Sequence, residues 1–106
     1  MLSGRAIVIG GGIGGLSMAL ALQRRGMAVS VYERARELRE IGAGIIMQPN
    51  GRKGLVDLGV DEAVAEVSCP MSMLHACHWA TGEVLSAVPN TAIAERYGLP
   101  SLAVHR

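Results

Sequence analysis

The residues whose types and spacing could do chemistry lie in the first third of the chain. Five of the six residues from Gly10 to Gly15 are glycine, and the acidic residue Glu33 follows about twenty residues later. Gly10 allows a tight turn, Gly12 leaves room for a pyrophosphate beside the backbone, and Gly15 allows close packing of a helix on a strand. The Glu33 carboxylate can accept hydrogen bonds from a ribose and would repel a 2′-phosphate, which disfavours NADP here. The pattern predicts a cradle for a dinucleotide.

The elements that must position these residues are indicated by the sequence around them. Residues 6–9 form a short apolar run bounded by glycine, which is typical of a buried parallel strand. Residues 16–25 predict a helix that stops at Gly26, and residues 29–32 predict a second strand. Such a βαβ unit is right-handed, and the free N–H groups at the start of its helix can face phosphates. The predicted fold class is therefore α/β, with a Rossmann-like βαβ unit over residues 6–34.

Residues 35–68 predict a glycine-containing loop followed by short helices. The charged run over residues 34–40 could form one or two solvated helical turns. The glycines at 42 and 44 give a second flexible stretch of backbone. Asn50 is a suitable N-cap for a short helix, and Gly59 is a suitable residue to end it.

Residues 73–88 predict a β-hairpin added to the βαβ unit. Alternating side chains favour one strand over residues 73–79 and its partner over residues 84–88, with a glycine-containing turn between them. On this interpretation Trp79 belongs to the first strand. Residues 101–105 predict one further strand.

Both cysteines and two of the three histidines fall in or beside this hairpin, so a metal site has to be considered. A site would have to collect Cys69, His75, Cys77 and His78. Their spacing fits no standard zinc pattern, which uses paired ligands such as C-x-x-C. Strand alternation explains the segment better, and we predict no metal ligand and assign no catalytic role to either histidine.

Composition excludes several classes of protein. The net charge is +1 without a basic patch, so nucleic acid is not an expected partner. The apolar stretch over residues 6–23 imitates a signal peptide or a membrane span. Its glycines would destabilise a helix by about 1 kcal/mol each relative to Ala, however, and its length is marginal for a bilayer. Two cysteines are too few for a disulfide framework. We therefore expect a cytoplasmic chain with no membrane partner.

Three blocks of the sequence resemble the FAD-dependent aromatic-ring hydroxylases, which are single-component flavin monooxygenases. They are VIGGGIGGLSMALALQRRGMAVSVYER, then IGAGIIMQPN with LVDLGV, and finally YGLPSLAVHR. Together they span nearly the whole chain, and they look most like the branch with salicylate and hydroxynicotinate hydroxylases. The resemblance implies FAD as cofactor, NAD(P)H as co-substrate, and O₂-dependent hydroxylation of a small aromatic substrate.

The resemblance also implies which residues contact FAD. The glycine loop would bind the pyrophosphate, Glu33 the adenosine ribose, and Arg34 would flank the adenine end. Residues 42–46 would pass close to the flavin, and the residue after His105 would contact FAD. The expected cofactor-binding residues are Gly10, Gly12, Ile13, Gly14, Gly15, Glu33, Arg34, Gly44, Ile45, Ile46 and Arg106. The family usually has Arg where this chain has Lys53, which keeps the charge but loses the planar fork.

The resemblance implies an enzyme several times longer than this chain. We therefore expect residues 1–106 to form an incomplete FAD-binding domain that is inactive alone, with open sheet edges and apolar faces. Two alternatives remain open. One is a stand-alone, non-catalytic nucleotide-binding module, and the other is a fragment of an NAD-dependent dehydrogenase. The GAGIIMQPN block disfavours the second.

Overall fold

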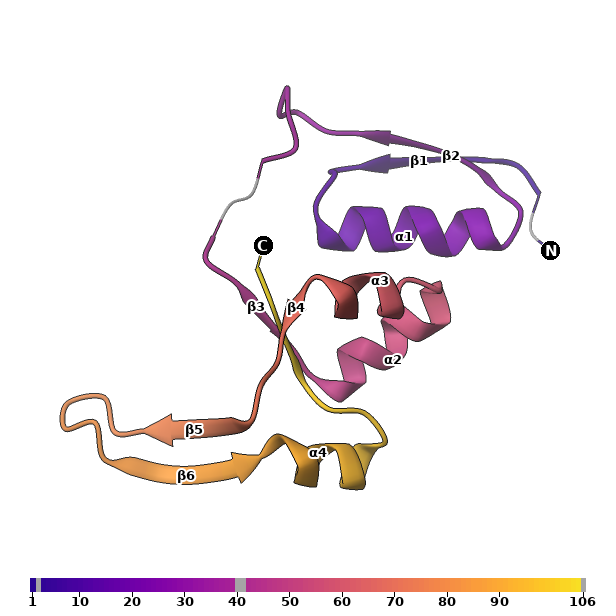
Figure 1. Cartoon of the computed structure of the whole chain (residues 1–106). Helices are drawn as coiled ribbons and strands as arrows, with labels where there is room; N and C mark the ends of the chain where they lie inside the picture. Colours follow the sequence, from indigo (N-terminus) through magenta and orange to yellow (C-terminus); the bar gives the residue numbers. More distant parts are fainter. Residues whose placement is uncertain (2, 40–41, 106) are drawn as a thin grey trace. The chain divides into compact units, whose positions relative to one another are not determined.

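The computed structural model describes residues 1, 3–39 and 42–105 (Figure 1). Its residues form two compact units, Met1–Glu40 and Ile41–Arg106. Within the described residues, no helix is both long enough and apolar enough to cross a bilayer.

The first unit is a βαβ unit, which confirms the predicted fold class. It contains β1 (Arg5–Ile9), α1 (Ile13–Arg24) and β2 (Ala28–Tyr32), and α1 lies along the two strands (Figure 1). The strands are parallel, with their paired residues running in register from one end of each strand to the other. Gly26 ends the helix with a φ of +93°, a conformation that favours glycine.

Helix α1 starts three residues earlier than its composition predicts. The expected start was residue 16, but Ile13 is the first helical residue, and Gly14 and Gly15 lie inside the first turn. The intrinsic helix penalty of glycine suggested a later start. The packing of Gly15 against Gly10 and Val8 outweighs that penalty, because a residue with a Cβ could not approach them so closely.

The charged run after β2 is not a helix where the structure describes it. Residues 34–37 form bends, residues 38 and 39 have no regular secondary structure, and all six are exposed. Arg39 and Glu37 make an exposed ion pair with 3.3 Å between Nη2 and Oε2. An isolated helix this short is unstable without an apolar face to bury, and this run offers none. The helical turns expected here were therefore wrong.

Where the structure describes it, the second unit contains a small antiparallel sheet, a β-hairpin and three helices. The sheet has the order β3–β7–β4, formed by β3 (Ile45–Met47), β7 (Leu102–Val104) and β4 (Ser68–Cys69). Between β3 and β4 the chain forms α2 (Pro49–Leu58) and α3 (Asp61–Glu66). The strand expected over residues 101–105 corresponds to β7.

Helix α2 begins two residues earlier than the predicted N-cap at Asn50 implies. Gln48 is its N-cap and Pro49 its first helical residue, so Asn50 lies inside the helix and does not cap it. Proline suits this first position because its fixed φ is already helical and its missing N–H would have no intrahelical partner. Gly59 ends the helix with a φ of +73°, as its position predicts.

The hairpin consists of β5 (Met73–Cys77) and β6 (Val84–Pro89), which are antiparallel. β5 is shorter than predicted, because the register is irregular at Ala76/Cys77 and the ladder ends there. Trp79 therefore lies in the turn, with 93% of its surface exposed, and shares no strand face with Cys77. Helix α4 (Asn90–Tyr97), which the sequence interpretation did not include, follows β6 directly.

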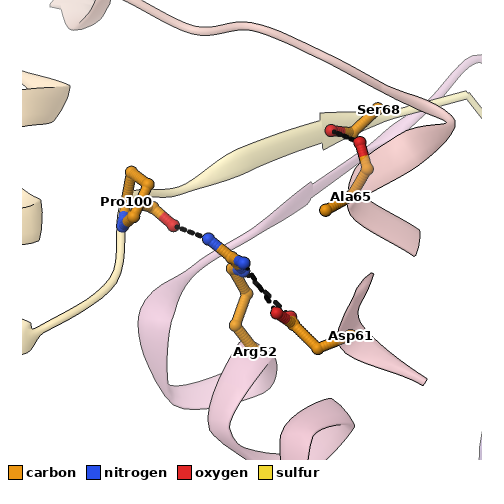
Figure 2. A network of polar contacts seen from close by, with 5 residues as sticks. All are labelled: Arg52, Asp61, Ala65, Ser68 and Pro100. Carbon is orange, nitrogen blue, oxygen red and sulfur yellow. Dashed lines mark hydrogen bonds and ion pairs between the residues drawn. The ribbon is translucent and has the colours of Figure 1, made fainter. Parts of the chain in front are cut away.

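The second unit is held together by buried polar groups, and no large apolar side chain in the described ranges is fully buried. Arg52 of α2 donates from Nε and Nη2 to the two carboxylate oxygens of Asp61, at 3.0 and 2.7 Å (Figure 2). Its Nη1 donates to the carbonyl oxygen of Pro100 at 3.0 Å. One guanidinium therefore joins α2, the start of α3 and the segment that leads into β7.

A second buried side chain, Asn90, fixes the start of β7. Its Oδ1 accepts the N–H of Ser101 at 2.8 Å, and its Nδ2 donates to the carbonyl oxygens of Ser101 and Met71, both at 2.9 Å. Asn90 thereby connects α4 to the segments before β5 and β7. All three hydrogen bonds of the side-chain amide are with backbone groups, so Asn90 links these segments through their backbones.

The Arg52–Asp61 pair predicts how stability depends on pH. The hydrogen bonds from Arg52 lower the pKa of Asp61. A lowered folded-state pKa gives stabilisation that is present above the unfolded value of about 3.9 and is lost as pH falls through the folded value. Urea unfolding of the second unit should therefore show a constant free energy at neutral pH and a decline below about pH 4. The part of this decline that comes from protonation of Asp61 should be absent in Asp61→Asn. An identical dependence of the unfolding free energy on pH in that variant would show that Asp61 is not its source.

Candidate dinucleotide-binding site

The turn from β1 into α1 is built by glycine backbone. Gly10 has a φ of +106°, which an L side chain rarely adopts, and its N–H donates to the carbonyl oxygen of Tyr32 at 2.7 Å. Gly12 is the N-cap of α1 in an extended conformation. The first strand, the glycine turn and the end of β2 therefore form one continuous piece of structure.

Gly15 lies against the turn so closely that a side chain cannot be accommodated. A Cβ at this position would overlap the carbonyl oxygen of Gly10 and would lie 3.0 Å from its carbonyl carbon and 3.4 Å from Cγ1 of Val8. This is the close helix–strand approach that the sequence predicts for Gly15. By contrast, a Cβ at Gly12 or Gly14 would meet nothing within 4 Å.

The start of α1 presents a row of free amides. The first helical hydrogen bond runs from the N–H of Leu16 to the carbonyl oxygen of Gly12 at 2.9 Å. The amides of Gly12 through Gly15 have no hydrogen-bond partner among the described residues, as the geometry of a helix start requires. No side chain caps the helix, and its first turn holds no acidic residue. The positive end of the helix is therefore available to an anion.

Glu33 follows β2 and turns its carboxylate toward the glycine loop. Oε1 accepts the N–H of Ala35 at 2.9 Å, and Oε2 accepts the N–H of Gly11 at 2.6 Å. These backbone hydrogen bonds, with Ala35 contributing most, lower the pKa of Glu33 below its ordinary value. The side chain is thus an ionised acceptor at neutral pH. Arg34 is the next residue and is exposed.

Gly11 was not among the predicted site residues, yet it is the buried residue of the loop. The resemblance placed the whole loop from Gly10 to Gly15 at the pyrophosphate, but separate functions were given only to Gly10, Gly12 and Gly15. The sequence did offer one signal: the GxGxxG motif does not require glycine at position 11, yet this chain has one there. The hydrogen bond from Gly11 to Glu33 can be seen only in the structure.

Gly44, Ile45 and Ile46 lie in the second unit, beside β7. A Cβ on Gly44 would lie 3.2 Å from the carbonyl oxygen of Val104, and Ile45 and Ile46 pair with Val104 and Ala103. These residues line an open cavity of about 270 Å³. Arg106, the remaining predicted site residue, lies outside the described residues. The predicted set thus forms two groups, one in each unit.

No three His, Cys, Asp or Glu residues in the ranges that the structure describes lie close enough together to hold a metal ion. Cys69 and Cys77 are exposed and unpaired with each other. His78 has a structural role instead, because its Nδ1 accepts the N–H groups of Ala80 and Thr81 in the hairpin turn, both at 3.3 Å.

Comparison with known proteins agrees with this geometry. Residues 8–39 match the family model of the NAD(P)-binding Rossmann-like domain. The chain is 39% identical over 106 residues to 6-hydroxynicotinate 3-monooxygenase of Pseudomonas fluorescens, covering 98% of this chain and 27% of that protein. It is 38% identical over 103 residues to 3-hydroxybenzoate 6-hydroxylase of Klebsiella oxytoca, covering 96% and 26%.

Solved structures give the same result. Klebsiella pneumoniae HpxO, complexed with FAD and uric acid, superposes with a TM-score of 0.80 at 35% identity, over 96% of this chain and 25% of that one. The tetrameric form of 2-methyl-3-hydroxypyridine-5-carboxylic acid oxygenase also superposes with a TM-score of 0.80, at 30% identity, over 99% and 26%. The chain therefore spans about a quarter of the relatives that it matches. The resemblance seen in the motifs is confirmed: over nearly its whole length, this chain is similar to FAD-dependent aromatic-ring hydroxylases.

Proposed function

We propose that this chain is the FAD-binding N-terminal part of a flavin-dependent monooxygenase that hydroxylates a small aromatic compound with NAD(P)H and O₂. One observation carries the proposal. The amides of Gly12 through Gly15 are free at the positive end of α1, and the ionised carboxylate of Glu33 lies beside the same loop. Donors for a pyrophosphate and an acceptor for a ribose are thus placed together, as an ADP moiety requires.

The open glycines fit this ligand. Gly15 is explained by packing inside the chain, but Gly12 and Gly14 have free space where a Cβ would be. Internal packing therefore does not account for glycine at these two positions. Close approach of a phosphate does, because a side chain on the loop would hold the phosphate away from the amides.

FAD, when bound, supplies the redox chemistry of the reaction. In the proposed site the loop residues Gly10, Gly12, Ile13, Gly14 and Gly15 hold the pyrophosphate. Glu33 and Arg34 bind the adenosine end, Gly44, Ile45 and Ile46 pass close to the flavin, and Arg106 contacts FAD. These residues bind and orient the cofactor, and none of them is assigned a proton transfer.

The relatives indicate the class of substrate. Two of them are named for hydroxynicotinate and hydroxybenzoate, which are small aromatic acids, and one solved relative is complexed with uric acid. We propose a small, electron-rich aromatic substrate for the whole enzyme. Because NAD(P)H is available in the cytoplasm, we place the activity there.

Titration of the purified chain with FAD, ADP and NAD tests the proposal. We expect ADP and FAD to raise the thermal stability of the chain and FAD fluorescence to change on binding. Gly12→Ala should keep the fold, since Ala can adopt the extended N-cap backbone and its weaker N-cap preference costs about 1 kcal/mol or less. The variant should bind ADP at least about tenfold more weakly, because its Cβ occupies space that is open beside the loop. Stabilisation by NAD but not by FAD would favour an NAD-dependent dehydrogenase, and equal ADP binding by Gly12→Ala would contradict the phosphate contact.

A further inference from the structure

Glu33 makes a close contact with Gly11 that binding a ribose does not by itself require. The N–H of Gly11 donates to Oε2 of Glu33 at 2.6 Å, a short distance typical of a charge-assisted hydrogen bond. A Cβ on Gly11 would lie 3.2 Å from Cβ of Glu33 and 3.3 Å from Cδ2 of Leu38. The side chains after β2 therefore lie close over Gly11, which is a buried residue, and its hydrogen bond to Glu33 is partly buried.

Two successive amides of the loop are anchored to the end of β2. Gly10 donates to the backbone carbonyl of Tyr32 at 2.7 Å, and Gly11 donates to the side chain of the next residue, Glu33. The amide of Gly12 and those after it are free. The anchored amides thus fix the direction in which the free amides point. A buried N–H without a partner is costly, so loss of the Glu33 acceptor would drive the loop to rearrange.

The carboxylate still has capacity for a ligand. Each carboxylate oxygen has two acceptor positions, and each accepts one backbone N–H, from Gly11 or from Ala35. One acceptor position on each oxygen therefore remains, which suits the adjacent 2′- and 3′-hydroxyls of a ribose. A glutamine could not serve both backbone donors, because its NH₂ group would face one of the two N–H groups.

We infer that Glu33 is a positioning residue for the pyrophosphate loop, acting through the amide of Gly11, in addition to being the ribose acceptor. This inference rests on the proposed function, since it concerns the same ADP site. Glu33 thereby couples the binding of the two halves of the ligand, because the carboxylate that binds the ribose also positions the loop that binds the phosphates.

A comparison of ADP with 2′,3′-dideoxy-ADP separates the two functions of Glu33. The dideoxy nucleotide lacks the ribose hydroxyls, so Glu33→Gln can weaken its binding only through the loop. We expect the variant to bind dideoxy-ADP about tenfold more weakly than the natural chain does. Equal binding of dideoxy-ADP by the two chains would overturn the inference and leave Glu33 as a ribose acceptor only.

Glu37→Gln is the matched control. Glu37 is exposed, lies in the same unit and, among the residues that the structure describes, pairs only with Arg39. This substitution therefore makes the same change of charge away from the loop. Loss of a negative charge by itself should tighten the binding of a phosphate, not weaken it. Weakening of dideoxy-ADP binding by both variants to the same extent would therefore count against the inference.

An NMR titration of the natural chain tests the same inference without requiring that a variant folds. In amide NMR spectra recorded over an acid titration, the proton shifts of Gly11 and Ala35 should move together, with one midpoint below the ordinary Glu value. A constant Gly11 shift while that of Ala35 moves would overturn the inference. Absence of ADP binding by the natural chain, with the joint titration intact, would instead reject the proposed function.

Discussion

Replacing Gly15 with Ala should unfold the start of α1 and remove nucleotide binding. The added Cβ overlaps the carbonyl oxygen of Gly10, which is backbone and cannot move without breaking the turn. We expect a loss of about 3 kcal/mol in the stability of the first unit, at the upper end of the usual range for over-packing. The helix-propensity gain of about 1 kcal/mol for Ala is too small to compensate. Hydrogen exchange at the β1 amides and ADP affinity measure the two effects.

Gly14→Ala is the matched control for stability. Gly14 is the preceding residue of the same helical turn, and a Cβ there meets nothing within 4 Å. This variant should leave exchange at β1 unchanged or slow it, because only the helix-propensity gain applies. Similar exchange rates in both variants would show that the contact between Gly15 and Gly10 does not limit the packing of α1.

Replacing Arg52 with Ala should have the largest effect on the second unit. The substitution leaves the carboxylate of Asp61 buried without its partner and removes the hydrogen bond to Pro100. Breaking such a pair costs about 3 kcal/mol or more. We expect the β7 amides to exchange correspondingly faster, because the segment that leads into β7 loses one of its anchors.

Two further variants make this test specific. Lys53→Ala removes the same charge from the adjacent, exposed residue of α2 and should leave exchange at β7 unchanged. The double variant Arg52→Met, Asp61→Leu removes both charges and should recover much of the lost stability, since no buried charge is left unpaired. A double variant as unstable as Arg52→Ala would show that the ion pair is not the source of the effect.

The βαβ unit could be predicted from sequence because its signals are local. A strand, a glycine turn, a helix with a glycine stop and a second strand follow one another within residues 6–34, and the parallel pairing of β1 with β2 follows from their order. The close approach at Gly15 was also predictable, since the motif carries that requirement. The functions of Gly11 and of Glu33 as its partner were not, because they depend on a contact between residues 22 positions apart.

The second unit was less predictable for the same reason. Its strands are short, and its stability depends on Arg52, which contacts a residue 48 positions away, and on Asn90, whose partners lie 11 and 19 positions away. Nothing in a one-dimensional pattern separates a buried Arg from an exposed Lys at the next position. The helical turns expected after Glu33 and the strand expected to reach Trp79 were both wrong. Charge spacing and local alternation do not reveal whether a segment packs against, or pairs with, another part of the chain.

The most direct test of FAD binding by this chain is an amide NMR titration with ADP. If the glycine loop is a pyrophosphate cradle, the largest saturable shift changes should fall on the free amides of Gly12, Ile13, Gly14 and Gly15, with smaller changes at Gly11 and Ala35 through Glu33. A spectrum that does not change with ADP, or saturable changes confined to residues after Glu40, would contradict the assignment of this site.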